Sequence, residues 1–344
     1  MTTEPLVTIG CAVYNGEKTL RRALAAICAQ DYSQLEILIA DDRSTDGSVD
    51  ICDMFARQDR RIRVIVNAAN VGVPRNYNNL FQEARGKYVM WADQDDVRDH
   101  TFVSKAVVAL EADPAAVLCH SHTGVFIGNP ADVKQVVTLN DDVKQIVTLN
   151  GVAGVMSPVK RYVRFLKRFS DTTVYGLCRS SALRKTRLWR NDLGTSNALL
   201  FELLLQGTFI QIPEVLYFYS GRGLTKRPSP REEYERQNPG KKMPRYYVPF
   251  IVLALNQTDG ICRSSLGLVQ KAALLCVLWG DVLAVGVTKA IYRLLFWASF
   301  GHVPKVITRV GDFVVSSRAD VVFLHGADRD EENFPKSWHL RGGS

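Results

Sequence analysis

The sequence predicts an α/β fold: a mostly parallel sheet flanked by helices, followed by a helical C-terminal extension. Over residues 6–119, short apolar runs with strand character alternate with segments whose apolar residues recur at helical spacing. Acidic residues follow two of these runs directly. Strands that alternate with helices imply parallel pairing with right-handed crossovers, so the acidic residues should meet at one edge of the sheet.

The first apolar run ends at Tyr14-Asn15-Gly16, and Asn15 is placed to cap the helix that follows. The second run stops at Asp41-Asp42, in a turn rich in Ser, Thr and Gly. In chain order, we expect strands over 6–13, 35–40, 62–66 and 87–92, and helices over 20–27, 52–55 and 73–84.

Three carboxylates, Asp93, Asp95 and Asp96, stand within four positions after the run at 87–92. Like charges this close repel, so the cluster favours a hard divalent cation such as Mg²⁺ or Mn²⁺. A solvated acidic turn is the alternative interpretation. Ligands of parallel sheets gather beyond the carboxyl ends of the strands. The polar residues expected at that edge are Asn15, Asp41, Asp42, Asp93 and Asp95.

The order of these motifs resembles family 2 glycosyltransferases of the GT-A fold over roughly residues 5–225. The residues that carry the resemblance are Val7-Thr8 through Tyr14-Asn15, Glu36 to Asp42 with Ser44, Asp46 and Gly47, Asn70-Val71-Gly72 with Arg75-Asn76, the acidic cluster, and Ile212 to Tyr217. The resemblance implies an inverting, metal-dependent transferase, of the hexosyltransferase class, that takes a UDP-, GDP- or dTDP-sugar.

The resemblance also implies roles for single residues. Asp42 would accept a hydrogen bond from the base edge of the nucleotide, and Asp41 would lie near the ribose. Asp95 would bind the cation that bridges the phosphates, with Asp93 as a ribose or supporting partner. Arg75 would contact phosphate or simply solvate its helix. The nucleotide site would also include Val13, Tyr14, Asn15 and Gln94.

The position of the catalytic base departs from the family pattern. Aligning 199–207 with the family's helix places Ser196 where an Asp usually removes the proton from the acceptor hydroxyl. A serine hydroxyl is too weak a base unless it is activated. Asp192 or Glu202 would then replace it, and Glu202 is equally explained as an ordinary helix residue. A catalytically weak or silent sugar-nucleotide-binding protein is therefore an alternative function.

Composition and charge indicate which chemical classes of partner the protein can bind. The chain has 344 residues, a net charge of +8 and a pI near 9.1, which suits acidic partners. Nucleic acid is the weaker choice of acidic partner, and we expect none, because no reader motif or basic helix with interleaved aromatics appears. A nucleotidyltransferase would need a Gly-rich phosphate loop with Arg or Lys after the first strand, and Tyr14-Asn15-Gly16-Glu17 is not one. The seven cysteines form no Cys-x-x-Cys pair, which indicates reduced core residues.

We expect a catalytic domain over 1–225, with a nucleotide-binding half at 1–119 and an acceptor half at 120–225. A Pro-rich, charged linker at 222–242 would lead into a mainly helical region within 226–344. The basic amphipathic segment 159–169 either packs on the core or contacts an anionic membrane. Charges interrupt the apolar stretch 266–300, which predicts packed or interfacial helices rather than a spanning one.

Residues 131–150 are a near-perfect tandem copy of ten residues, which suits an inserted surface hairpin. Nothing at the N-terminus resembles a signal peptide. The expected location is cytoplasmic, with peripheral contact at the inner face of the cell membrane. A glycan or lipid-linked acceptor in cell-envelope synthesis is the expected context.

Overall fold

The computed structural model describes residues 4–126, 136–137, 157–167, 171–220 and 229–298. Its strands are β1 (Val7–Val13), β2 (Leu35–Asp41), β3 (Ile62–Val66), β4 (Tyr88–Asp93), β5 (Val97–Arg98), β6 (Ala116–Phe126), β7 (Val136–Val137), β8 (Leu177–Arg179) and β9 (Thr208–Ser220). Its helices are α1 (Glu17–Cys28), α2 (Ser48–Gln58), α3 (Val73–Glu83), α4 (Phe102–Ala112), α5 (Pro158–Lys167), the 3₁₀ helix η2 (Asp171–Tyr175), α6 (Ser180–Leu183), α7 (Thr195–Gln206), α9 (Pro230–Gln237), α10 (Pro249–Arg263) and α11 (Leu268–Ala298).

The strands of the described residues form one mixed sheet in the order β3-β2-β1-β4-β8-β6-β9-β5, with β7 paired to β6. The predicted parallel pairing of the first four long strands is confirmed, because β1 pairs parallel with β2 and β4, and β2 pairs parallel with β3. The register joins Val13 to Asp41 and Ala12 to Asp93. The ends of three neighbouring strands therefore share one edge.

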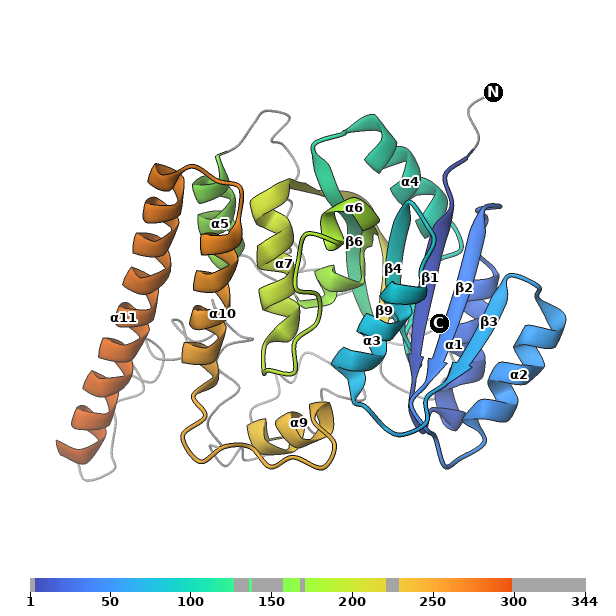
Figure 1. The fold of residues 1–344 in the computed structure, drawn as a ribbon, viewed down its shortest axis with the longest axis horizontal. Helices are drawn as coiled ribbons and strands as arrows, with labels where there is room; N and C mark the ends of the chain where they lie inside the picture. The colour runs from blue at the N-terminus through green and yellow to red at the C-terminus, as the bar shows by residue number, and fades with distance from the viewer. Residues whose placement is uncertain (1–3, 127–135, 138–156, 168–170, 221–228, 299–344) are drawn as a thin grey trace, which may run out of the picture.

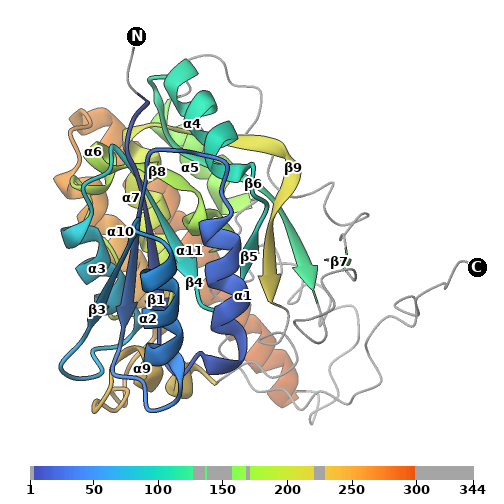
Figure 2. The ribbon, with the colours of Figure 1, turned by 90° about the vertical axis from the view of Figure 1, so that its right-hand side faces the viewer.

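Helices cover both faces of this half, which explains why β1 and β2 are buried at every position. Tyr77 and Leu80 of α3 pack with Leu38 on one face. Leu24 of α1 packs with Ile37 on the other face, where α2 also lies. Figures 1 and 2 show α3 on one side of the strands, and α1 and α2 on the other.

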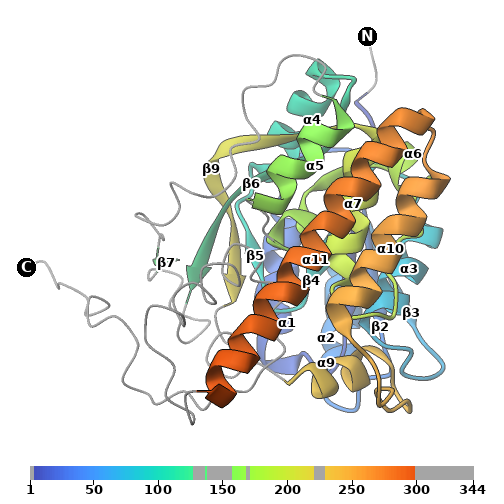
Figure 3. The same ribbon diagram turned by 90° about the vertical axis from the view of Figure 1, so that its left-hand side faces the viewer.

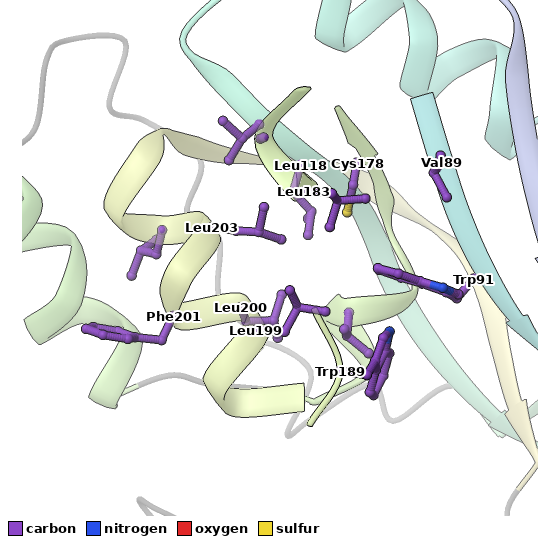
Figure 4. Packing of buried hydrophobic residues seen from close by; sticks show 14 of the residues in the cluster. Val89, Trp91, Leu118, Cys178, Leu183, Trp189, Leu199, Leu200, Phe201 and Leu203 are labelled. Carbon is purple, nitrogen blue, oxygen red and sulfur yellow. The ribbon is translucent and has the colours of Figure 1, made fainter. Parts of the chain in front are cut away.

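The second half is built around α7. β8 lies between β4 and β6 and is antiparallel to both, whereas β6 and β9 are parallel. The buried face of α7 packs toward Trp91 and Trp189, as Figure 4 shows. The same hydrophobic cluster includes Ile261 of α10 and Leu274 of α11. The C-terminal helices thus share a core with the sheet.

The segment 222–242, expected as the boundary between two regions, contains helix α9, which begins with a capping box: Ser229 Oγ accepts from the Glu232 N–H, and the Glu232 side chain accepts from the Ser229 N–H. One local expectation is wrong. Asn15 does not cap α1. Gly16 is the N-cap of that helix, because the Asn15 side chain is engaged by the turn after β2.

The basic segment 159–169 contains α5, whose Tyr162 and Phe165 are buried, so that face packs on the core. Arg161 donates to the carbonyls of Leu204 and Leu205 at the end of α7. Within the described part of the chain, no helix is long and apolar enough to cross a bilayer. Except for β7, the tandem repeat at 131–150 lies outside the described residues.

Candidate active site

Asp42 is a buried anchor for the loop between β3 and α3. Its Oδ1 accepts from Asn67 Nδ2 at 2.9 Å and from the Val71 N–H at 2.8 Å. Its Oδ2 accepts from the Gly72 N–H at 2.8 Å. Three donors compensate the burial of this carboxylate, which is 3% exposed. Asp42 therefore shapes the loop expected to face the nucleotide.

In Asp41, the adjacent residue, only one of the two carboxylate oxygens accepts a hydrogen bond from the residues that the structure describes. Its Oδ1 accepts from the Ser44 N–H at 2.9 Å. Its Oδ2 is buried and accepts no hydrogen bond from any residue that the structure describes. Because a buried acceptor without a donor is costly, this oxygen is the stronger candidate for a ligand contact. The family resemblance, by contrast, implies that Asp42 contacts the base, and this role stays a prediction.

The end of β1 is tied to both neighbouring strand ends. Asn15, with φ +50°, donates its N–H to Ser44 Oγ at 2.9 Å and accepts from the Thr45 N–H at 2.8 Å. Gln94 Oε1 accepts from the Tyr14 N–H at 2.8 Å, and Gln94 Nε2 donates to the Tyr14 carbonyl at 3.0 Å. Asn15 and Gln94 thus bind the protein's own backbone, and Tyr14 leaves 43% of its surface exposed.

Val13 contributes to the same edge through its backbone. The Val13 carbonyl accepts from the Asp42 N–H at 2.7 Å, while its side chain is buried in the core. Arg75 lies on the exposed side of α3. The two sequence-based alternatives for Arg75, phosphate contact or simple solvation, both remain predictions.

Asp93, Asp95 and Asp96 converge after β4 as predicted. One carboxylate oxygen from each of the three lies within 4.8 Å of those of the other two. Tyr77 of α3 donates its hydroxyl proton to Asp93 Oδ1. On the other side of the cluster, Arg22 of α1 donates to the Asp95 carbonyl oxygen at 2.6 Å. Elements from both faces of the sheet therefore fix the positions of these carboxylates.

Asp96 is the deepest of the three, at 6% exposed. Tyr217 of β9 donates its hydroxyl proton to Asp96 Oδ2, and the Ser220 N–H donates to Asp96 Oδ1 at 2.8 Å. Burial raises the pKa of Asp96 to about 8, and the charges of Asp93 and Asp95 add to this rise. Asp96 thus holds β9 against the acidic cluster.

A buried guanidinium lies beneath the cluster. Arg98 of β5 donates to the carbonyls of Trp91 and Tyr175. Its charge stacks over the ring of Tyr217, 4.5 Å from the centroid. Burial lowers the pKa of Arg98, while the nearby Tyr217 and Asp96 act against that change. A permanent positive charge under three carboxylates offsets part of their mutual repulsion.

The donor set fits a hard divalent cation, because oxygen ligands with negative charge are what Mg²⁺ and Mn²⁺ prefer. Asp93 and Asp95 border the cluster at intermediate exposure, whereas both Asp96 oxygens already accept hydrogen bonds. The assignment of the ion to Asp95, with Asp93 beside it, stays a prediction. Asp96 is better described as their support.

Two candidate bases, Asp192 and Ser196, lie at the start of α7, whereas Glu202 lies further along this helix. Asp192 Oδ2 accepts from Arg190 Nε and from Asn256 Nδ2, each at 3.2 Å. Ser196, in the first turn of α7, is partly exposed. Glu202 is buried: its Oε2 accepts from the Arg187 N–H at 2.8 Å and its Oε1 from Arg187 Nε at 2.9 Å. This pairing favours the interpretation of Glu202 as an ordinary structural residue.

Helix α9 lies at the same end of the molecule as the strand ends, beneath the sheet in Figure 1. Gly72, with φ +86°, has no room for a side chain, because a Cβ would lie 2.4 Å from the Gln237 carbonyl oxygen. Asn238 Nδ2 donates to the Asn191 carbonyl at 2.9 Å. The α9 region therefore bridges the loop held by Asp42 and the loop that carries Asp192.

Sequence reasoning missed the tyrosines and the arginine that support the cluster. Tyr77 had been recognised only as part of a helix face, and Tyr217 lies 121 positions after its partner Asp96. Trp189 stacks on Tyr77 with ring centroids 4.8 Å apart. A buried tyrosine needs a hydrogen-bond partner, but nothing local in the sequence identifies that partner.

Comparison with known proteins agrees with this geometry. The model of the family described as glycosyl transferase family 2 matches residues 8–185, more than half of the chain. The protein therefore belongs to this family.

Among curated relatives, glycosyltransferase GlyA of Streptococcus pneumoniae is 34% identical over 118 residues, which cover 33% of this chain and 17% of GlyA. Putative glycosyltransferase EpsE of Bacillus subtilis is 32% identical over 112 residues, which cover 32% of this chain and 40% of EpsE. The match to these relatives thus spans less than half of their length.

Solved structures show the fold. TarS 1–349 of S. aureus in complex with UDP-GlcNAc superposes with a TM-score of 0.55 at 13% identity, covering 92% of this chain and 89% of that one. The mannosyltransferase PcManGT of Pyrobaculum calidifontis, in complex with GDP-Man and Mn²⁺, gives 0.54 at 14% identity, covering 94% and 86%. The predicted GT-A fold is confirmed.

Proposed function

We propose that this glycosyltransferase is an inverting, divalent-metal-dependent enzyme that moves a sugar from a nucleoside diphosphate to an acceptor hydroxyl. The observation that carries the proposal is the convergence of Asp93 and Asp95 with the buried oxygen of Asp41 at neighbouring strand ends. A cation held there would neutralise the charge that develops on the departing diphosphate. Asp41 and the loop fixed by Asp42 would receive the nucleoside.

The acceptor side would be formed by the loop before α7. In a single displacement, a base removes the proton of the attacking hydroxyl, on the face opposite the leaving group. Asp192 is the candidate that this loop offers, since Glu202 is engaged by Arg187. Its bonds to Arg190 and Asn256 hold the carboxylate in place.

A role in cell-envelope glycan or glycolipid synthesis is part of the proposal. It is supported by relatives such as the putative teichuronic acid biosynthesis glycosyltransferase TuaG of Bacillus subtilis, 32% identical over 93 residues. These residues cover 27% of this chain and 37% of TuaG. A lipid-linked acceptor would bring the protein to a membrane surface, where we propose peripheral contact. The cytoplasmic location stays a prediction.

A second candidate function is a sugar-nucleotide-binding protein with weak or no turnover. The observation that favours it is Ser196 at the position of the base, together with the arginine partners of Asp192 and Glu202. One experiment separates the two functions. The purified protein is incubated with UDP-, GDP- and dTDP-sugars and Mn²⁺, and both nucleotide binding and donor hydrolysis are measured. Hydrolysis that chelator abolishes supports the enzyme, and binding without hydrolysis supports the second candidate.

A further inference from the structure

The turn between α10 and α11 exposes two large apolar side chains at its tip. Leu268 and Val269 are each 84% exposed, as the first residues of α11. Single exposed apolar residues are ordinary on protein surfaces, but two adjacent ones at the tip of a helical hairpin are less so. Figure 1 places this turn at the end of the molecule opposite α9. The exposed pair is thus separate from the candidate active site.

The apolar surface continues along the outer side of α11. Exposed positions recur at three- and four-residue spacing from Val269, and none of them carries a charge: Ala272, Cys276, Gly280 and Leu283. Leu283 is 65% exposed, whereas Leu274 and Leu278 on the inner side are buried. Figure 3 shows α11 in front of α10 and α5, as the outermost helix of that side. We call Leu268, Val269 and Leu283 the α11 outer face.

The charged residues nearest the tip of the turn are positive. Residues 260–280 contain Arg263 and Lys271 but no Asp or Glu, whereas Asp259, paired with Arg187, and Asp281 directly flank this stretch. Lys271 donates to the Cys262 carbonyl at 2.8 Å, which keeps its ammonium group at the turn, and Arg263 is exposed. Lys160 of the neighbouring helix α5 is exposed as well. An apolar strip with a cationic border is complementary to an anionic lipid surface.

We propose that the α11 outer face is a membrane-docking surface, which inserts Leu268 and Val269 shallowly into an anionic bilayer while Arg263 and Lys271 contact lipid phosphates. A second copy of the chain is the alternative occupant of this face, and the oligomeric state of the protein distinguishes it. This inference rests on the proposed peripheral contact and gives it a surface away from the candidate active site, so the docking is argued independently of a lipid-linked acceptor and requires neither nucleotide nor metal.

Flotation of the full chain with vesicles tests the proposal. The wild type should bind vesicles of phosphatidylcholine with phosphatidylglycerol, and bind much less to phosphatidylcholine alone or at high salt. The double variant Leu268→Glu, Val269→Glu should lower the bound fraction about tenfold or more, because two carboxylates replace the inserting side chains. Val108→Glu is the matched control, since Val108 on α4 is also exposed, at 68%. It should bind vesicles as the wild type does.

A second pair of variants separates the contribution of charge to vesicle binding from the contribution of apolar insertion. Arg263→Gln with Lys271→Gln should weaken binding and reduce its dependence on salt, whereas Arg57→Gln, an exposed arginine of α2, should not. Nucleotide binding should stay at the wild-type level in all of these variants, so a failure here is distinct from a failure of the proposed transferase function. The proposal is overturned if the double glutamate variant floats like Val108→Glu. It is equally overturned if the wild type is a dimer that this variant converts to monomers.

Discussion

Gln94 holds Tyr14 by two hydrogen bonds to its backbone, one to the N–H at 2.8 Å and one to the carbonyl at 3.0 Å. The side-chain amide thereby continues the pairing of β1 and β4 beyond the last backbone pair of the register, Ala12 with Asp93. Because Gln94 stands between Asp93 and Asp95, this contact also fixes the acidic cluster relative to the end of β1. Gly16 is part of the arrangement, since a Cβ there would lie 2.4 Å from Gln94 Oε1.

Removing this amide should loosen the metal site. We expect Gln94→Leu to lower the free energy of unfolding by about 1 kcal/mol, the usual net value of such bonds, and to weaken Mn²⁺-dependent nucleotide binding. Urea unfolding and calorimetry measure the two effects. Gln34→Leu, at an exposed glutamine, is the control. Wild-type affinity in Gln94→Leu would mean that the cluster is positioned without the Tyr14 contact.

Asp95→Asn should keep the fold and weaken Mn²⁺-dependent binding of a nucleoside diphosphate at least about tenfold, since a neutral amide is a poorer ligand for a hard ion. Calorimetry with and without chelator measures the change. Asp31→Asn, an exposed carboxylate elsewhere, should bind like the wild type. If the affinity of Asp95→Asn is also unchanged, Asp95 does not hold the ion.

The two adjacent acids after β2 should respond in opposite ways to the same substitution. Asp42→Asn places an amide against three donors and should cost about 1–3 kcal/mol of unfolding free energy. Asp41→Asn can keep the acceptor for Ser44 and should not lower stability, but it should weaken nucleotide binding. Thermal unfolding and calorimetry on both variants check the contrast. Equal losses of stability would contradict it.

The candidate base can be tested at two positions. Asp192→Asn should lower kcat about a hundredfold or more, the usual scale for a lost general base, and leave nucleotide affinity intact. Ser196→Asp should raise the transfer rate, whereas Ser196→Ala should not. The assignment fails if neither Asp192→Asn nor Ser196→Asp changes the rate of an efficient transferase.

The stability of the metal-free protein should fall as pH rises. The pKa of Asp96 is raised from 3.8 to about 8, so between these values the folded protein keeps a proton that the unfolded chain has released. The stabilisation from this group is therefore fully present below pH ~4 and is lost as pH approaches about 8. Urea unfolding across this range measures the slope. Asp96→Asn should flatten it; the same slope in both proteins would place its origin elsewhere.

The sequence predicts the parallel strands β1 to β4 well because their signals are local. Continuous apolar runs predict strands that are covered on both faces. Parallel pairing then places the acids at the ends of β2 and β4 at one edge of the sheet. The clustering of Asp93, Asp95 and Asp96 was therefore predictable, whereas the donors that orient them were not. Tyr217 and Arg98 reach the cluster through packing between distant segments, which no local pattern encodes.

Helix α9 is absent from the sequence-based prediction for a different reason. Its capping residues Ser229 and Glu232 are a readable signal, but the surrounding prolines and charges favoured a linker. Its position against Gly72 depends on tertiary contacts and could not be deduced. Glu202 is the opposite case. The sequence offers it as a candidate base, but the structure pairs its carboxylate with Arg187, a contact that the sequence does not reveal.

The hydrophobic cluster that joins Trp91 to α10 and α11 can be completed only late in synthesis on the ribosome. When residue 220 has been made, every strand that the structure describes already exists. Ile261, Leu274 and Leu278, which complete the cluster around α7, are still to come. The side of α7 that contacts α10 therefore remains uncovered until α10 emerges, and a nascent chain paused before it would present leucine-rich surface to chaperones.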